Sequence, residues 1–287
     1  MIAVWKHELS NYFHSLTAYI FSAFLLALVG LGAMLYNIQS AVANFEYVLS
    51  FVSLGFVVMI PIVTMRVVAE ERKQKTDQLL YSLPLKTTHI ILGKYLALLV
   101  VYLAPLLIIS FYPLIFAQFG EVYLPTSFGS LFAFFMMGAA LLAVGIFISS
   151  LTENTGFAAG IAISVILLNY YSVTLAEYVS STSLGSAIAF AGIAAVLGFV
   201  VRYVTKHNRL AYGVAVALCL AVLGVYALDR SKFEGLLPDI MTKLSLFERF
   251  YKFVNGVFDL TAIIYYITVI VFFLFLSVQS LEKRRYN

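Results

Sequence analysis

Charged residues are scarce in this chain: aspartate, glutamate, lysine and arginine make up 11% of its 287 residues, whereas soluble domains carry about 25%. With 62% hydrophobic residues, the chain has too little polar surface to cover a globule in water. Cysteine occurs once, at Cys219 inside an apolar run, which excludes an internal disulfide and a cysteine metal cluster. The four histidines lie far apart without metal-ligand spacing, so we predict no metal site.

Long apolar runs dominate the sequence instead. Those of about 18–26 residues are long enough to cross a hydrocarbon layer roughly 30 Å thick. They lie near residues 17–36, 48–68, 91–117, 128–150, 157–176, 185–204, 210–228 and 260–281. We therefore predict an all-α fold, a polytopic transmembrane helix bundle of about eight spans, which forms one membrane domain over residues 1–287.

Further absences narrow the function. No predicted span carries an ionisable side chain in its middle third, since Lys94 and Glu177 lie close to span ends. This argues against a proton-coupled carrier and against a channel with a charged filter, although a filter of backbone carbonyls would leave no such trace. The phosphate loop G-x-x-x-x-G-K-[ST] is absent, so we expect no ATP hydrolysis by this chain. No catalytic set of side chains converges near a span, so we predict that the chain is not an enzyme.

Residues 1–16 predict an amphipathic helix that lies in the membrane surface. Apolar Trp5, Leu9 and Phe13 recur at helical spacing, and polar side chains occupy the opposite face. The alternative is a cleaved signal peptide, because residues 41–43 have the small-residue pattern of a cleavage site. The apolar run before them is too long for a signal core, so we favour the uncleaved helix.

The lysines and arginines set the expected orientation. With a cytoplasmic N-terminus, eight spans return the C-terminus to the same side, and thirteen of the eighteen basic residues fall on cytoplasmic segments. The other five all lie in one long external segment, 229–259. The short loops then follow the positive-inside rule, which predicts that both termini are cytoplasmic in a prokaryotic cell membrane. Because the basic excess is a topology signal, we expect no nucleic-acid partner.

The densest charge cluster lies in the segment 66–94, between the second and third predicted spans. Residues 70–83 have a helical pattern with leucines on one face and charged side chains on the other, and Pro84 ends it. A short amphipathic helix at the membrane face suits the docking of a cytoplasmic partner. A solvated loop that only fixes the topology accounts for this composition equally well.

The same segment carries an ordered set of short motifs: Arg66, Ala69-Glu70-Glu71-Arg72, Lys75-Thr76, Leu79-Leu80, Ser82-Leu83-Pro84 and Gly93-Lys94. This order resembles the cytoplasmic loop of the type-2 ABC exporter permeases, where the segment is a coupling helix in a cleft of the ATP-hydrolysing subunit. The resemblance implies that this subunit is contacted by Arg66, Glu70, Glu71, Arg72, Thr76, Asp77, Leu80 and Pro84. Lys75 stands where many relatives have glycine, and because we place it within a helix we expect little harm from it.

A second amphipathic pattern covers residues 244–260, where apolar side chains form one helical stripe. It predicts a helix in the outer membrane interface. This segment, the basic tail 282–285 and the loop 149–154 resemble the gliding-motility and copper-enzyme-maturation branch of these permeases.

The resemblance covers residues 1–176 and 240–287. The usual fold of that branch has six spans, so the predicted helix pair 185–228 is an addition to it.

The resemblance implies a permease subunit of an ABC transporter, more specifically an exporter that works by alternating access. A separate ABC ATPase subunit would bind ATP and magnesium, and this chain would bind no cofactor. A second permease copy or a sibling, the lipid bilayer and an extracytoplasmic accessory protein are the other implied partners. Two alternatives stay open: a complex that transmits force or signal to an extracytoplasmic partner without transport, and a non-ABC channel or scaffold.

The substrate path is less clearly marked. Asn169, Tyr170 and Tyr171 in the fifth predicted span could line it, although tyrosines near helix ends are more often interface anchors. Pro61 in the second predicted span and Pro105 and Pro113 in the third are candidate kinks, but we favour plain helix geometry over a gating role for each of them. The mostly apolar spans suit a lipid-like, amphipathic or peptide cargo better than a small ion.

Overall fold

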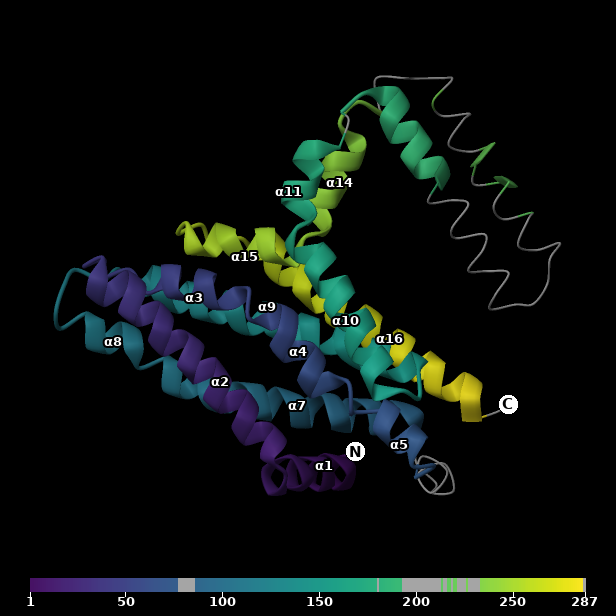
Figure 1. The fold of residues 1–287 in the computed structure, drawn as a ribbon, viewed down its shortest axis with the longest axis horizontal. Coiled ribbons are helices and arrows are strands. Elements are labelled where there is room, and N and C mark those ends of the chain that lie inside the picture. The colour runs from purple at the N-terminus through teal and green to yellow at the C-terminus, as the bar shows by residue number, and fades with distance from the viewer. Residues whose placement is uncertain are drawn as a thin grey trace. The chain divides into compact units, whose positions relative to one another are not determined.

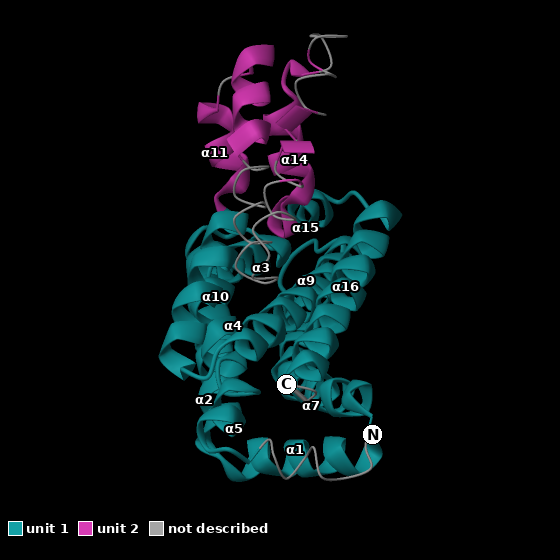
Figure 2. Cartoon of the chain, turned by 90° about the vertical axis from the view of Figure 1, so that its right-hand side faces the viewer, with its two compact units in different colours: residues 1–170, 249–287 teal, residues 171–248 magenta. Residues whose placement is uncertain are grey.

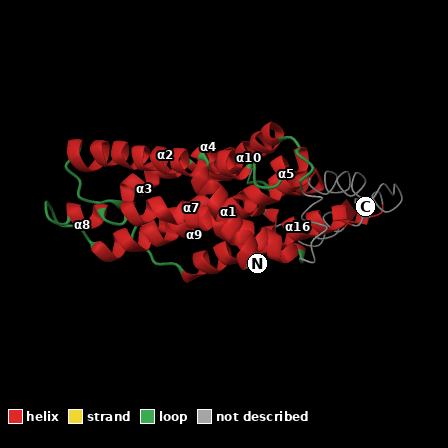
Figure 3. Cartoon of the chain, turned by 90° about the horizontal axis from the view of Figure 1, so that it is seen from below, coloured by secondary structure: helices red, strands yellow, loops and turns green. Residues whose placement is uncertain are grey.

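The computed structural model describes residues 1–76, 86–179, 181–192 and 233–285, together with residues 213, 216, 217, 219, 220 and 226. The regular elements in these ranges are all helices (Figure 3). The chain divides into two compact units, residues 1–170 with 249–287 and residues 171–248, which are coloured separately in Figure 2. The prediction of an all-α fold is therefore confirmed for the described part of the chain.

The first unit contains most of the helices (Figure 1). In chain order they are α1 (Ile2–His14), α2 (Leu16–Gly32) continued by the wider turns of η1 (Ala33–Gln39), α3 (Glu46–Ser53), α4 (Phe56–Thr64), α5 (Ala69–Lys73), α7 (Thr87–Ile109), α8 (Tyr112–Phe116), α9 (Leu124–Leu151), α10 (Thr155–Tyr170), α15 (Leu246–Val254), which starts in the second unit, and α16 (Leu260–Arg285). The second unit contains α11 (Ser172–Tyr178), a helix over Ser183–Gly192, and α14 (Leu236–Leu244).

Four helices are long and apolar enough to cross a membrane, and each of two bent helix pairs adds one more if it counts as a single span. They run over Leu16–Gln39, Thr87–Phe116, Leu124–Leu151 and Leu260–Arg284, with the pairs Glu46–Ser53 plus Phe56–Lys73 and Thr155–Tyr170 plus Ser172–Tyr178. This is the pattern of a multi-pass membrane protein. Six of the eight predicted spans coincide with these helices. The other two, within 185–228, lie largely outside the described residues.

Helix α9 is the centre of the first unit. It packs against α3, α4, α7, α10 and α16, and 83% of its most apolar window is buried in the protein. A helix covered on every side needs no polar face, which accounts for the absence of charge along Leu124–Leu151. Its neighbours fit into two notches on its surface, since a Cβ at Gly138 would overlap the Tyr102 ring and one at Gly145 would overlap Thr64.

The second candidate span is broken, but the break is not at the candidate kink Pro61. The helix axis bends by 60° between the segments Glu46–Ser53 and Phe56–Lys73, across the break at residues 54 and 55. Pro61 lies inside α4 and does not mark this break. Gly55 lies in the break, and a Cβ there would come within 3.0 Å of the Val52 carbonyl oxygen and would overlap the Leu28 side chain.

The predicted amphipathic helix over 244–260 is shorter in the structure. α15 ends at Val254, and Gly256 has a φ of +80°, a left-handed conformation that glycine adopts readily and that ends the helix. The part of the apolar stripe that lies on α15 is buried in the protein, whereas Val257 and Phe258 beyond it are 56% and 62% exposed. The Phe250 ring packs on Phe134 of α9 with ring centroids 5.7 Å apart, and Ser130 of α9 donates a hydrogen bond to the Phe253 carbonyl.

Candidate functional site

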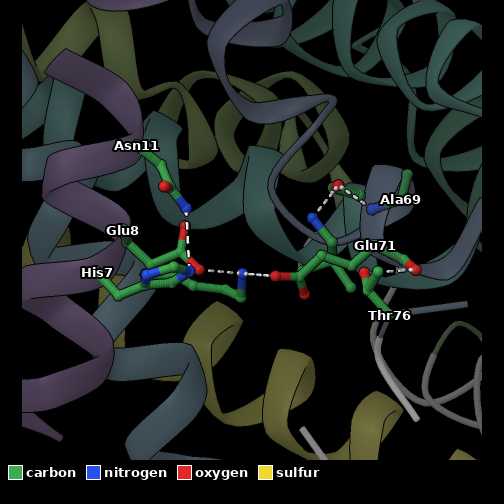
Figure 4. A network of polar contacts seen from close by, with 9 residues as sticks. His7, Glu8, Asn11, Ala69, Glu71 and Thr76 are labelled. Carbon is green, nitrogen blue, oxygen red and sulfur yellow. Dashed lines mark hydrogen bonds and ion pairs between the residues drawn. The ribbon is translucent and has the colours of Figure 1, made fainter. Parts of the chain in front are cut away.

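Helix α5 follows the second span, and its first turn is fixed by a side chain from α9. The Ser149 hydroxyl accepts hydrogen bonds from the backbone N–H groups of Val68 (3.2 Å) and Ala69 (3.1 Å) and donates to the Met65 carbonyl (3.2 Å). The first N–H groups of a helix have no partner within it. Because a fully buried serine of another helix supplies that partner, the start of α5 is tied to α9 (Figure 4).

The other side of α5 is tied to α1 and α7 by a cluster of three charges. The Lys94 ammonium of α7 lies 2.7 Å from Glu8 Oε1 of α1 and 2.5 Å from Glu71 Oε1 of α5. The exposed fractions of these side chains are 2% for Lys94, 13% for Glu8 and 25% for Glu71. Figure 4 shows Glu8 and Glu71 directed toward each other from their two helices. We call these residues the Lys94 triad.

Because the Lys94 side chain is buried, the triad fixes how α1, α5 and α7 lie relative to one another. A buried ammonium keeps its charge only where acceptors replace the water that it has lost, and here two carboxylates do so. Tyr12 of α1 lies beside the triad, and burial together with the carboxylates of Glu8, Glu71 and Glu70 raises the pKa of its phenol well above the ordinary value. The phenol therefore stays protonated and adds no negative charge to the cluster.

Gly93 lets α1 approach α7 closely enough for the triad to form. A Cβ at this position would lie 3.0 Å from Val4 Cγ1 and 3.2 Å from the Trp5 backbone nitrogen, so a larger residue would push the two helices apart. The dipeptide Gly93-Lys94 thus has two adjacent tasks. The glycine allows the contact between the helices, and the lysine holds it.

Helix α5 ends sooner than the sequence predicted. α5 ends at Lys73, and Lys75 has a φ of 59°, in the left-handed region, while residues 77–83 of the predicted helix lie outside the described residues. The Thr76 N–H donates to the Glu71 carbonyl and the Lys75 N–H to the Arg72 carbonyl, which is the hydrogen-bond pattern of a Schellman helix end. Our assumption that Lys75 lies within a helix is therefore wrong, because the position is one where glycine is favoured.

Lys75→Gly is expected to raise the stability of the protein by about 0.5–1 kcal/mol, since glycine adopts the left-handed conformation without the cost that Cβ imposes. The thermal unfolding midpoint of the protein in detergent measures the change. Lys73→Gly is the matched control, because Lys73 lies in the helix, and there glycine is expected to lower stability by about 1 kcal/mol. A loss of stability in both variants would contradict the left-handed turn.

The predicted coupling residues divide into an outward and an inward set. The side chains of Arg66 and Glu70 are 58% and 41% exposed, with Arg66 Nε 3.9 Å from Glu70 Oε2. Thr76 is exposed, and its hydroxyl donates to the Glu71 carbonyl. Glu71 turns inward to Lys94, and Arg72 is buried at 4% exposure. Asp77, Leu80 and Pro84 lie outside the described residues.

The N-terminal helix is present, as predicted, over Ile2–His14. Trp5 and Leu9 are partly buried and Phe13 is 39% exposed. The polar face, for which we predicted no function, contributes Glu8 to the triad. Glu8, Lys94 and Ser149 are thus the residues of this site that sequence reasoning missed.

The residues proposed for a substrate path lie elsewhere. Asn169 and Tyr170 end α10, Tyr171 follows directly, and their side chains range from partly buried to 45% exposed for Tyr171. The structure does not bring these residues to the Lys94 triad. Their role in a substrate path stays a prediction.

The C-terminal helix reaches the same end of the first unit as α1 and α5. Ser280 donates to the Ser150 carbonyl (2.9 Å), and Arg284 pairs with Glu153. The hydrogen bond and charge of Arg284 lower the pKa of the Glu153 carboxyl. The end of α9 and the loop after it thus contact α16, while Ser149 of α9 contacts the start of α5, so α1, α5 and the end of α16 gather at one end of the helices (Figure 1).

A second polar cluster lies at the opposite end of α9. Glu46 is 3% exposed and accepts hydrogen bonds from the Ser127 hydroxyl (3.0 Å) and the Asn44 amide (2.6 Å). Ser127 and Ser149 belong to one helix and are about 33 Å apart at 1.5 Å per residue. The cluster fixes the start of α3 to α9 and is separate from the Lys94 triad.

Within the described ranges, no group of three histidine, cysteine, aspartate or glutamate side chains is placed to share a metal ion. At the site described above, α1, α5, α7 and α9 meet through polar side chains. Comparison with protein-family models, with curated proteins and with solved structures gives no match to this chain.

Proposed function

We propose that this chain is the membrane permease subunit of an ABC exporter in the cytoplasmic membrane of a prokaryote, with about eight spans and both termini in the cytoplasm. The observation that supports this most is the fixation of α5. It is short, follows a broken span, and is joined through Ser149 to α9 and through Glu71 and Lys94 to α7 and α1. A force applied to this segment would reach three other helices without passing through a flexible loop.

The exposed side of the segment supports a partner at that end of the helices. Arg66, Glu70 and Thr76 present charge and hydrogen-bonding groups there, next to the inward-facing Glu71. The charged surface suits specificity and fast association with a protein partner. In the proposed complex an ATPase subunit binds this surface, and closure of two such subunits moves the spans of two permease copies.

The geometry also separates two tasks that adjacent glutamates perform. Glu70 is available to a partner, whereas Glu71 holds the permease together internally. A variant that changes both residues at once would mix loss of docking with loss of internal stability. The test of the proposal therefore changes Glu70 alone.

Glu70→Arg is expected to abolish the co-purification of a stoichiometric P-loop ATPase that accompanies the wild-type chain, since a charge reversal in the interface introduces repulsion as well as removing a contact. The chain is purified in mild detergent from its native membranes, the bound ATPase is identified by mass spectrometry, and its vanadate-sensitive activity is measured. Glu121→Arg is the control, because Glu121 is exposed in the loop before α9, at the other end of that helix from Ser149. Absence of any ATPase from the wild-type preparation would end the proposal.

A further inference from the structure

Two grooves on the first unit meet at Arg66 and differ in chemistry. One, of about 730 Å³, lies between α1 and the α4–α5 region and is lined largely by polar side chains, among them Glu8, Glu70 and Gln74. The other, of about 280 Å³, runs between α2 and α4 and is lined by apolar side chains. Thr17, Val63 and Arg66 line both, so the two grooves adjoin at these residues.

The smaller groove suits an alkyl chain. Its walls include Ile20, Phe24, Val58 and Ile62, with exposed fractions of 59%, 48%, 47% and 44%. These side chains come from two of the candidate spans, so they face hydrocarbon and not water. A groove walled by uncovered apolar side chains within the bilayer is filled at least cost by a chain of methylene groups.

The charges around the junction select the polar head of such a molecule. Arg66, whose side chain is 58% exposed, lines both the apolar and the polar groove, and the planar fork of its guanidinium suits a phosphate. With Arg66 matched to a phosphate, the carboxylates of Glu8, Glu70 and Glu71 outnumber the ammonium of Lys94 in the polar groove. A positive group is therefore favoured beyond the phosphate.

We propose that the two grooves bind an amphipathic lipid with a zwitterionic phosphate–amine head, with one acyl chain between α2 and α4, the phosphate at Arg66 and the ammonium at Glu70. This inference rests on the proposed function, because it names the class of molecule that the permease takes up. Phosphatidylethanolamine is the probe of that class. Phosphatidylglycerol, which has the phosphate and the chains without the amine, is the comparison.

Native mass spectrometry of the full chain, delipidated in detergent and exposed to each lipid in turn, measures the occupancy. The wild type is expected to retain phosphatidylethanolamine about tenfold better than phosphatidylglycerol, and Arg66→Ala to lower that retention about tenfold, since charge-assisted hydrogen bonds are worth this much in affinity. Glu70→Gln is expected to abolish the preference between the two lipids. Free phosphoethanolamine is expected not to compete, because it lacks the acyl chain.

Ile62→Trp, which fills the apolar groove, is expected to reduce retention of phosphatidylethanolamine, whereas Ile267→Trp is not. Ile267 is 48% exposed on α16, so it is a matched apolar surface position away from the groove. Equal retention of both lipids by the wild type and by Arg66→Ala would mean unspecific surrounding lipid and would overturn the inference. So would a change of oligomeric state in Ile62→Trp with lipid retention intact, because a second copy would then cover the groove.

These experiments distinguish failure of the permease proposal from failure of the lipid-site proposal. Lipid retention needs no ATPase, so its loss with ATPase co-purification intact would remove the lipid site and leave the permease. Specific lipid retention in a chain that never binds an ATPase would remove the permease proposal and leave the lipid site.

Discussion

Lys94→Met is expected to lower the free energy of unfolding by about 3 kcal/mol, because it leaves the carboxylates of Glu8 and Glu71 close together without the ammonium between them. Removal of one partner from a buried ion pair costs about 3–5 kcal/mol. We take the lower end because the Glu71 side chain is 25% exposed and regains part of its hydration. The thermal unfolding midpoint in detergent is expected to fall by roughly 6–12 °C.

Two comparisons test whether this loss comes from the triad. Lys243→Met is the control for removal of a lysine from an ion pair, since its pair with Asp239 is exposed at 69% and 52% and is expected to contribute little. The triple variant Lys94→Met, Glu8→Gln, Glu71→Gln is expected to regain most of the lost stability, because neutral groups in place of a buried ion cluster are often tolerated. If Lys94→Met unfolds at the wild-type temperature, the triad does not form.

The spans were predictable because the bilayer restricts the chain severely. In hydrocarbon every backbone N–H and C=O must be satisfied within the segment, so a long apolar run is a helix whatever its neighbours are. The runs near 91–117 and 128–150 therefore coincide closely with Thr87–Phe116 and Leu124–Leu151. The packing of these helices was less accessible, since it depends on which glycine faces which side chain.

The structure of the segment 66–94, which we propose to be the coupling segment, was only partly predictable from the sequence, for a local reason. Its helical pattern is real at Glu70 and Glu71, but the helix ends where Lys75 adopts a left-handed conformation. Lysine gives no sequence signal for such a turn, whereas glycine or asparagine would have done so. The sequence shows that Lys75 stands where many of the permeases that the chain resembles have glycine, but it does not show that this position adopts a left-handed conformation.

The Lys94 triad was inaccessible for a different reason. Lys94 is separated from Glu71 by 23 positions and from Glu8 by 86, so no local periodicity connects the three residues. From its neighbours in the sequence alone, Glu8 is a polar residue on a surface helix and Lys94 is a charge at the end of a span. One usable signal was the cost of placing a lysine beside Gly93 at the start of an apolar helix, since such a charge needs a partner.

Gly145→Leu is expected to destabilise the protein by about 3 kcal/mol or to prevent its folding, because the position receives the side chain of Thr64. A Cβ there would overlap the Thr64 hydroxyl and methyl groups. Thr64 is fully buried and its hydroxyl donates to the Ile60 carbonyl at 2.9 Å, so it cannot move aside cheaply. Extra atoms in a well-packed core cost about 1–3 kcal/mol. The position matters for the proposed function because α4 leads directly into the segment 66–94.

Gly145→Ala and Gly129→Ala form a matched pair on α9. Nothing lies within 4 Å of a Cβ at Gly129, so alanine there is expected to be neutral or to stabilise by up to about 1 kcal/mol through helix propensity. Alanine at Gly145 is expected to cost about 1–2 kcal/mol, and Thr64→Ala in the same chain to restore part of that loss by removing two of the three overlapping atoms. Equal unfolding midpoints for the two alanine variants would mean that α4 and α9 do not pack at this glycine, and α5 would then lack the rigid support through which the proposed coupling acts.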